Sequence, residues 1–117
     1  MKIEVKEYVR EDGSSPYKTW FDGLNAHAAA KVTVAKARLE LGNTSAIKWF
    51  RGIGECVIDW GPGYRIYVAK EGDALILLLG GGTKQGQQRA IDQAVASHGE
   101  YKARKKALAL ARKGKSA

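Results

Sequence analysis

The chain has 117 residues and a formal net charge of +8. This length fits one domain and is too short for two full ones. A single cysteine, Cys56, excludes an intrachain disulfide and a cysteine-rich zinc site. The longest apolar run, Ala74–Leu79, is too short to span a bilayer, and residues 1–7 hold no signal-peptide core. We therefore expect a cytoplasmic protein with no membrane partner.

The positive charge is concentrated at the C-terminus. Residues 1–100 carry 13 Lys and Arg against 12 Asp and Glu, whereas residues 101–117 carry seven cations and no acid. Two interpretations stay open, namely an electrostatic arm for nucleic acid or the solvated end of a helix. Such an arm adds affinity without specificity, because it contacts phosphates rather than bases.

The first part of the chain predicts a strand followed by a helical hairpin. Alternating apolar and charged residues over Lys2–Val9 indicate a half-buried strand. Ser15 and Pro16 supply the N-cap and first position of a short helix with an aromatic stripe. Asn25 caps a second helix over Ala26–Leu41, which ends at a Gly-Asn pair. Two helices joined this closely form a helical hairpin.

The remaining sequence changes to the period of β-strands and then returns to that of a helix. Four strand candidates follow the hairpin, at Ile47–Arg51, Glu55–Trp60, Tyr64–Lys70 and Ala74–Leu79. Tight turns between the last three predict an antiparallel meander. We expect Thr83 to cap a helix over Lys84–Ser97, which Gly99 weakens before it resumes over Tyr101–Ala111. The predicted class is therefore α+β.

The glycine-rich segment Gly80–Lys84 is the first candidate for binding an anion. Glycines allow close backbone approach, a following helix N-terminus offers free N–H groups, and Lys84 adds a positive charge. The residue order of a P-loop is absent. A plain glycine-lined turn between strand and helix is the alternative interpretation.

Arg65 and Tyr67 form the second candidate. Both lie on one face of the predicted strand Tyr64–Lys70, and that face is open if the opposite face packs on helices. The hairpin to the next strand brings Arg65 beside Gly80–Lys84, at an end of the sheet suited to a phosphodiester. Tyr67 would stack on a base or donate a proton. The alternative for Arg65 is a cross-strand ion pair with Asp59.

Other kinds of site have less support in the sequence. The chain has no HExxH, CxxC, GxSxG or GxGxxG motif, and its two histidines lie 71 positions apart, so we expect neither a metal nor another cofactor. A carboxylate pair formed by Glu55 and Asp59 stays open. Further cations are candidates for contacts with RNA: Lys48, Arg51, Lys102, Arg104, Lys105 and Lys106.

Several ordered motifs resemble the RelE/HigB superfamily of type II toxin–antitoxin toxins, within it the phage-derived addiction module killer protein branch. The resemblance extends from about Tyr8 to Lys102. Its most specific motifs are Gly61-Pro62-Gly63-Tyr64-Arg65-Ile66-Tyr67 and Gly81-Gly82-Thr83-Lys84. It implies a RelE/ParE-like fold with an N-terminal strand, a helical hairpin, an antiparallel meander and a C-terminal helix. That domain would cover residues 1–106, and residues 107–117 would form a basic extension.

The resemblance also implies a function. Proteins of this superfamily cut mRNA on the 70S ribosome without a metal, by attack of a ribose 2′-OH on the adjacent phosphate. A helix-turn-helix antitoxin neutralises them in this branch. Carried onto this chain, Arg65 would bind the scissile phosphate and Lys84 would bind phosphate or shuttle a proton, with Tyr67 as a third catalytic candidate.

Three residues depart from the family's pattern. Val57 stands where arginine is common, Thr83 replaces an acidic residue and Ala90 replaces an aspartate. The change at Val57 removes a candidate phosphate ligand. Two alternatives to the nuclease therefore stay open: a toxin of the same fold that poisons DNA gyrase, and a degenerate member that binds only RNA or its antitoxin.

Overall fold

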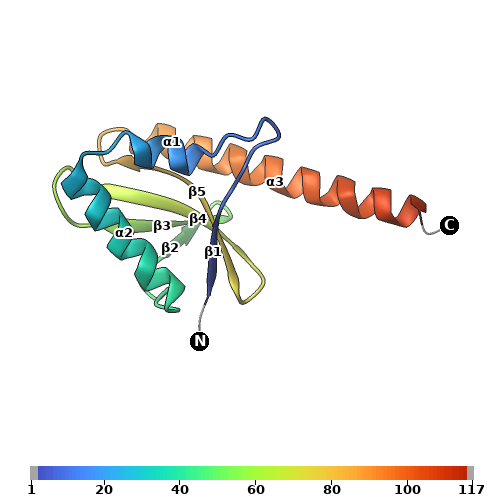
Figure 1. Cartoon of the computed structure of the whole chain (residues 1–117), viewed down its shortest axis with the longest axis horizontal. Helices are drawn as coiled ribbons and strands as arrows, with labels where there is room; N and C mark the ends of the chain where they lie inside the picture. Colours follow the sequence, from blue (N-terminus) through green and yellow to red (C-terminus); the bar gives the residue numbers. More distant parts are fainter. Residues whose placement is uncertain (1–2, 116–117) are drawn as a thin grey trace.

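A computed structural model describes residues 3–115, which form one five-stranded mixed sheet and three helices (Figure 1). The elements in chain order are β1 Glu4–Glu7, α1 Pro16–Asp22, α2 Ala26–Glu40, β2 Lys48–Phe50, β3 Ile53–Ile58, β4 Tyr64–Glu71, β5 Leu75–Thr83 and α3 Gln87–Lys115. The predicted α+β class and the C-terminal helix are confirmed. No helix within those residues has the length and apolar character needed to cross a bilayer.

The sheet has the strand order β1-β5-β4-β3-β2. Strands β3, β4 and β5 form the antiparallel meander that the turn residues predict, and β2 extends it by pairing antiparallel with β3. β1 joins the far edge in parallel to β5, but it opposes only Leu75–Leu78. The edge strands β1 and β2 are thus shorter than their neighbours, so part of β5 and part of β3 lack a strand on the outer side.

Local capping signals start α1 and α2. The Ser15 side chain accepts a hydrogen bond from the Lys18 backbone N–H at 3.1 Å, and Pro16 follows at the first helical position. Asn25 caps α2 by accepting from the Ala28 N–H at 2.9 Å. Both predicted caps are confirmed, because an N-cap depends only on residues within one turn.

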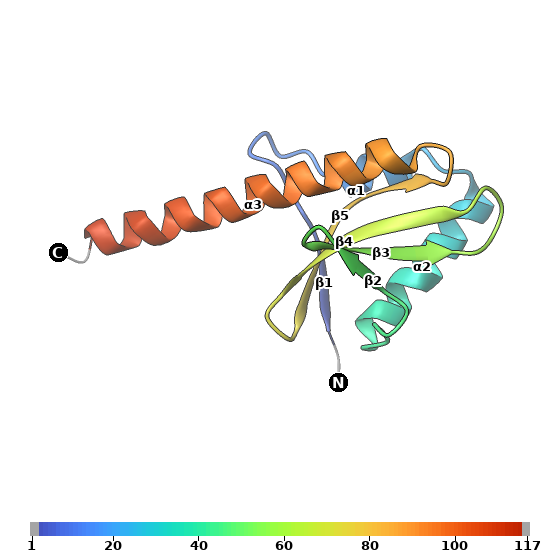
Figure 2. The same cartoon turned by 180° about the vertical axis from the view of Figure 1, so that it is seen from behind.

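Helices cover both faces of the sheet (Figures 1 and 2). α1 and α2 pack on the face that contains Ile66 and Leu78. α3 packs on the opposite face, where Tyr67 and Leu79 meet Ile91. The expectation that Arg65 and Tyr67 lie on an open face is therefore wrong, because α3 crosses that face and encloses both side chains.

The glycine run does not end the last strand. β5 continues through Thr83, and α3 begins only at Gln87, so the predicted helix start at Thr83 and Lys84 is wrong. Pairing with β4 keeps these residues extended, with Gly81 and Gly82 opposite Ile66 and Arg65. The glycines serve close packing, since a Cβ on Gly81 would overlap the Trp20 indole and one on Gly82 would lie 2.8 Å from the Ala90 side chain.

α3 is one uninterrupted helix of 29 residues. It passes Gly99, where we expected a weak point, because one glycine costs a helix only about 1 kcal/mol. Its C-terminal half projects from the body, which gives the molecule an extent of 55 Å along its longest axis (Figure 2). The helix runs through the predicted boundary at residue 106. Lys2 of the first predicted strand and residues 116–117 of the predicted extension lie outside the described residues.

We predict that Gly81→Ala lowers the free energy of unfolding by about 1–3 kcal/mol, because the added methyl group must displace the Trp20 ring. Gly80→Ala is the matched control, since no atom lies within 4 Å of the Cβ it would add, and its effect should stay within about 0.5 kcal/mol. Urea unfolding monitored by circular dichroism measures both. Equal losses in the two variants would contradict the packing explanation.

Candidate functional site

The candidate site is built across β3 and β4, on the face that α3 covers. Val57 pairs with Arg65 and Glu55 pairs with Tyr67, so these four side chains share one face. The Arg65 Nε lies 3.5 Å from the Glu55 Oε2, and the two side chains are 11% and 5% exposed. The carboxylate partner of Arg65 is therefore Glu55. The alternative pairing with Asp59 is wrong, because Arg65 lies opposite Val57 in the register and its ion pair is formed with Glu55.

Glu55 is a buried carboxylate held by several donors. Its Oε2 accepts hydrogen bonds from the Tyr67 hydroxyl at 3.0 Å and from the Gln87 Nε2 at 2.8 Å, besides the ion pair with Arg65. A buried charge is tolerated only with such partners. Gln87 is a site residue that was not predicted from the sequence, because its contact with a carboxylate 32 positions earlier leaves no local pattern.

Tyr67 is completely buried. Burial is the main cause that raises the pKa of its phenol, and the hydrogen bond to Glu55 and the negative charge of Glu55 raise it further, against a smaller opposing effect of Arg65. A base cannot stack on a ring that is covered on both sides. The structure therefore makes Tyr67 a partner of Glu55 inside the core rather than a surface for RNA.

Arg65 and Lys84 meet at the carbonyl group of Gly63. That oxygen accepts a hydrogen bond from the Arg65 Nη1 at 2.7 Å and another from the Lys84 backbone N–H at 3.1 Å. Gly63 has a φ of 75°, a conformation that favours glycine. The predicted approach of Arg65 to the glycine-rich segment is confirmed, whereas Lys84 lies in the turn before α3 and has an exposed side chain.

The cations near β2 have separate surroundings. Lys48 lies on β2 opposite Glu55 in the register, with an exposed side chain. Arg51 lies in the following turn with a φ of 52°, so the predicted strand Ile47–Arg51 is one residue too long at each end. Its Nη1 forms an exposed ion pair with the Asp92 Oδ1 of α3 at 2.9 Å. Arg51 is therefore partly neutralised, and Lys48 is the more available cation.

The four cations proposed on α3 divide into two pairs. Arg104 donates to the Val9 carbonyl at 2.6 Å and lies over the Tyr8 ring, and Lys105 pairs with the Glu71 carboxylate at 2.6 Å. Lys102 and Lys106 are exposed and form no ion pair with any other residue of 3–115. The first pair holds α3 on the body, and the second points its charge to solvent.

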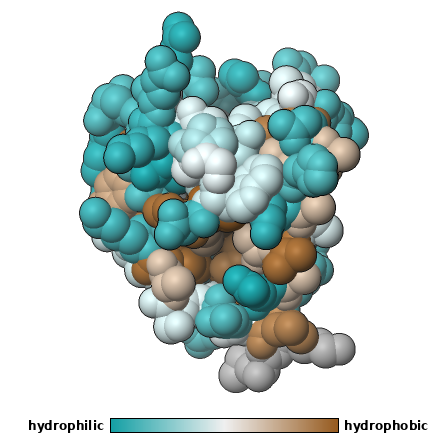
Figure 3. Space-filling model, turned by 90° about the vertical axis from the view of Figure 1, so that its left-hand side faces the viewer, coloured by the Kyte–Doolittle hydropathy of each residue, from teal (hydrophilic) through white to brown (hydrophobic). Residues whose placement is uncertain are grey.

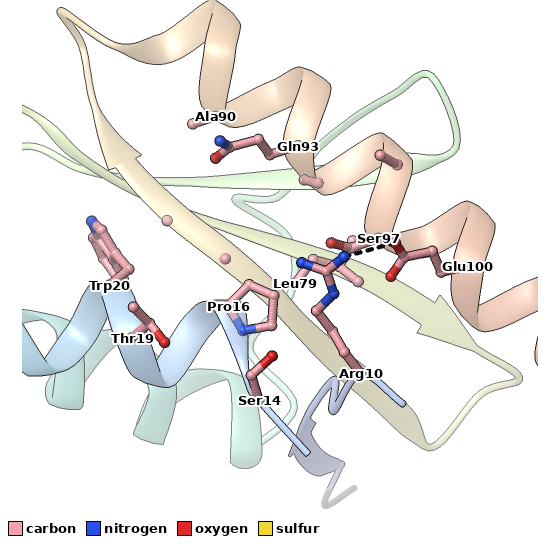
Figure 4. Close-up of a pocket in the computed structure, with 14 residues that line it drawn as sticks. Arg10, Ser14, Pro16, Thr19, Trp20, Leu79, Ala90, Gln93, Ser97 and Glu100 are labelled. Atoms are coloured by element: carbon pink, nitrogen blue, oxygen red, sulfur yellow. Dashed lines mark hydrogen bonds and ion pairs between the residues drawn. The ribbon is translucent and has the colours of Figure 1, made fainter. Parts of the chain in front are cut away.

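A separate groove lies between α1 and α3 above β5 (Figure 4). Its volume is about 490 Å³, with Trp20 and Thr19 along one wall and Gln93 along the other. Arg10 is the one cation of the groove, and its guanidinium pairs with the Glu100 carboxylate at 3.2 Å. Among residues 3–115, no three His, Cys, Asp or Glu side chains gather as a metal site would require.

Comparisons with known proteins give one informative match. A Haemophilus influenzae protein, described as an uncharacterized protein, is 40% identical to this chain over 96 residues. The match covers 80% of this chain and 91% of that protein. The chain belongs to the same family as this Haemophilus protein. No family model matches the sequence.

We predict that Tyr67→Phe lowers the free energy of unfolding by about 1–2 kcal/mol near neutral pH, because Glu55 loses a buried donor. The variant should also show a weaker dependence on alkaline pH. Folding raises the pKa of Tyr67, so its contribution is complete below the unfolded pKa of about 10 and is lost as pH rises above that value.

Urea unfolding at about pH 8 and about pH 11 tests this expectation, with Tyr17→Phe as a control. Burial raises the pKa of Tyr17 to about 12, but no carboxylate accepts its hydroxyl among the described residues. At pH 8, only Tyr67→Phe should therefore lose the part of the free energy of unfolding that the hydrogen bond to Glu55 contributes. Identical pH dependence of the wild type and the Tyr67 variant would contradict the prediction.

Proposed function

We propose that the protein is the toxin of a type II toxin–antitoxin module and a ribosome-dependent mRNA endoribonuclease with a RelE-like fold. The resemblance of the Arg65 and Lys84 motifs supports this proposal, as does the order of one strand, two helices, four further strands and a C-terminal helix. Its partners would be mRNA on the 70S ribosome and a helix-turn-helix antitoxin, in the cytoplasm.

The observation that carries the proposal is the fixed position of Arg65 beside an exposed lysine. Two contacts hold the guanidinium, one to the Gly63 carbonyl and one to Glu55, and the same carbonyl fixes the backbone of Lys84. A cation held in this way needs little reorganisation when charge develops on a phosphate. The pair therefore suits a phosphodiester better than any neutral substrate.

The proposed reaction uses these two cations without a metal. The ribose 2′-hydroxyl gives up its proton to water as its oxygen forms a bond to the adjacent phosphorus, the bond from phosphorus to the 5′-oxygen breaks, and a cyclic phosphate remains. Arg65 stabilises the extra negative charge on the phosphate oxygens, and Lys84 binds the phosphate and supplies a proton to the leaving oxygen. Tyr67 acts indirectly in this scheme, since its hydroxyl holds the carboxylate that orients Arg65.

A toxin without nuclease activity is the second candidate, and Val57 favours it. This residue lies opposite Arg65 in the strand pairing and is 52% exposed. An apolar side chain at this place offers nothing to a phosphate. A gyrase poison of the same fold, or a degenerate member that binds only RNA or antitoxin, would tolerate valine there.

We predict that Arg65→Ala reduces translation-dependent mRNA cleavage about 100- to 1,000-fold, the effect of removing one donor to a developing anion. Lys84→Ala should reduce cleavage at least about tenfold, because its charge is exposed and less fixed. The measurement is primer extension on mRNA in a cell-free translation system, with and without translating ribosomes.

Two controls make the experiment specific. Lys36→Ala removes a cation of α2 outside the site and should leave cleavage unchanged. Arg65→Lys keeps the charge but not the planar donor geometry, and it should remain nearly as impaired as Arg65→Ala. Thermal unfolding must show that each variant is folded. Intact mRNA with wild-type protein would reject the nuclease and direct the work to gyrase, and cuts that survive both substitutions would reject the site.

We predict that Lys102→Gln combined with Lys106→Gln weakens binding to a single-stranded RNA of about 20 nucleotides. Two free charges should lower the slope of log affinity against log salt by about 1.4. Lys105→Gln is the contrast, since its ammonium already pairs with Glu71, and should change the slope less. Fluorescence anisotropy at several salt concentrations gives the slopes. Equal changes in slope for the double variant and for Lys105→Gln would contradict the distinction between paired and unpaired cations on α3.

A further inference from the structure

The outer edge of β3 is only half covered. β2 opposes Ile53, Gly54 and Glu55, and no other described strand continues along that side beside Cys56–Ile58. On its inner side the same stretch pairs with β4. The Ile58 carbonyl at the end of this stretch accepts the Trp60 backbone N–H at 2.8 Å. A strand edge that lacks a neighbouring strand is a template for another extended chain.

A groove runs beside this open edge. It lies between α2 and the end of β3 and has a volume of about 520 Å³. Ile47, Cys56 and Ile58 contribute apolar surface to it, and Val34 of α2, which is 50% exposed, stands at its wall. The molecule viewed from the side on which α2 lies shows apolar side chains gathered in a hollow between polar ones (Figure 3). If a strand paired with the open edge, every second side chain of that strand would point into this apolar hollow.

The charges around the groove favour an acidic occupant. Lys31 and Arg38 stand seven residues apart on α2, on one face of the helix, and both line the groove. Neither forms an ion pair within residues 3–115, although Lys31 lies 5.7 Å from the centre of the Trp60 ring. Asp59 is the one carboxylate among the lining residues. The groove therefore has an excess of free positive charge.

We propose that this groove binds an extended, acidic peptide segment of a partner protein, which adds to the open edge of β3 as a further strand. Its apolar side chains would pack between α2 and the sheet, and its carboxylates would pair with Lys31 and Arg38. The proposal concerns partner binding and does not depend on RNA cleavage.

Two other occupants fit less well. A second copy of this chain would bring another net charge of +8 against a groove with free cations. Nucleic acid would set phosphates against an apolar floor, where they lose water without gaining donors. A peptide supplies backbone groups that can pair with the open edge of β3. It also supplies apolar side chains that can fill the groove.

The test uses phage-displayed peptides of ten random residues, selected on the full chain. Enriched sequences should alternate apolar residues with others and carry Asp or Glu. A synthetic peptide of the enriched sequence should bind Lys31→Glu combined with Arg38→Glu about tenfold more weakly or worse. Lys70→Glu combined with Arg89→Glu makes the same charge change on exposed residues outside the groove and should leave the affinity unchanged.

The single cysteine locates the bound peptide. Cys56 lines the groove, so binding should slow its alkylation by iodoacetamide. A peptide methylated on alternate backbone nitrogens should lose affinity, because strand addition needs those N–H groups. Three outcomes would overturn the proposal: no acidic enrichment, equal affinity of the two double variants, or unchanged Cys56 alkylation at saturating peptide.

Discussion

The buried carboxylate of Glu55 constrains much of this structure. One oxygen meets Arg65 and Tyr67 of β4 and Gln87 at the start of α3, so a single charge joins two strands to the C-terminal helix. Burying such a carboxylate is costly unless its partners keep their places. The register of the hairpin, the start of α3 and the direction of the Arg65 guanidinium are therefore linked, and a change in one disturbs the others.

This network also separates the roles of the site residues. Arg65 is fixed and mostly enclosed, Tyr67 is fully enclosed, and Lys84 remains in the turn with its ammonium exposed. The proposed chemistry therefore depends on one rigid and one adaptable cation. Val57 beside them leaves an apolar exposed surface, and the cleavage experiment decides whether a phosphate can still bind next to it.

The short edge strands shape the rest of the surface. β1 opposes only the first part of β5, and β2 opposes only the first part of β3. Each sheet edge therefore has an open portion next to a helix, and a groove lies near each one. In the groove near β5, Arg10 is paired with a carboxylate, whereas the cations in the groove near β3 form no ion pair within the described part of the chain. Because of this difference in charge, we expect the two grooves to bind different ligands.

The sequence by itself determined the features that depend on neighbouring residues. The caps at Ser15 and Asn25, the two consecutive helices and the antiparallel pairing of β3, β4 and β5 follow from contacts within a few positions, which a local pattern records. It also placed Arg65 near the glycine run, since hairpin pairing is a local constraint. Only the tertiary structure decided that α3 covers the Arg65 face, that β5 includes the glycines and that Glu55 is the buried partner. These features arise from contacts between distant segments, and the side chains that make them carry no local signal.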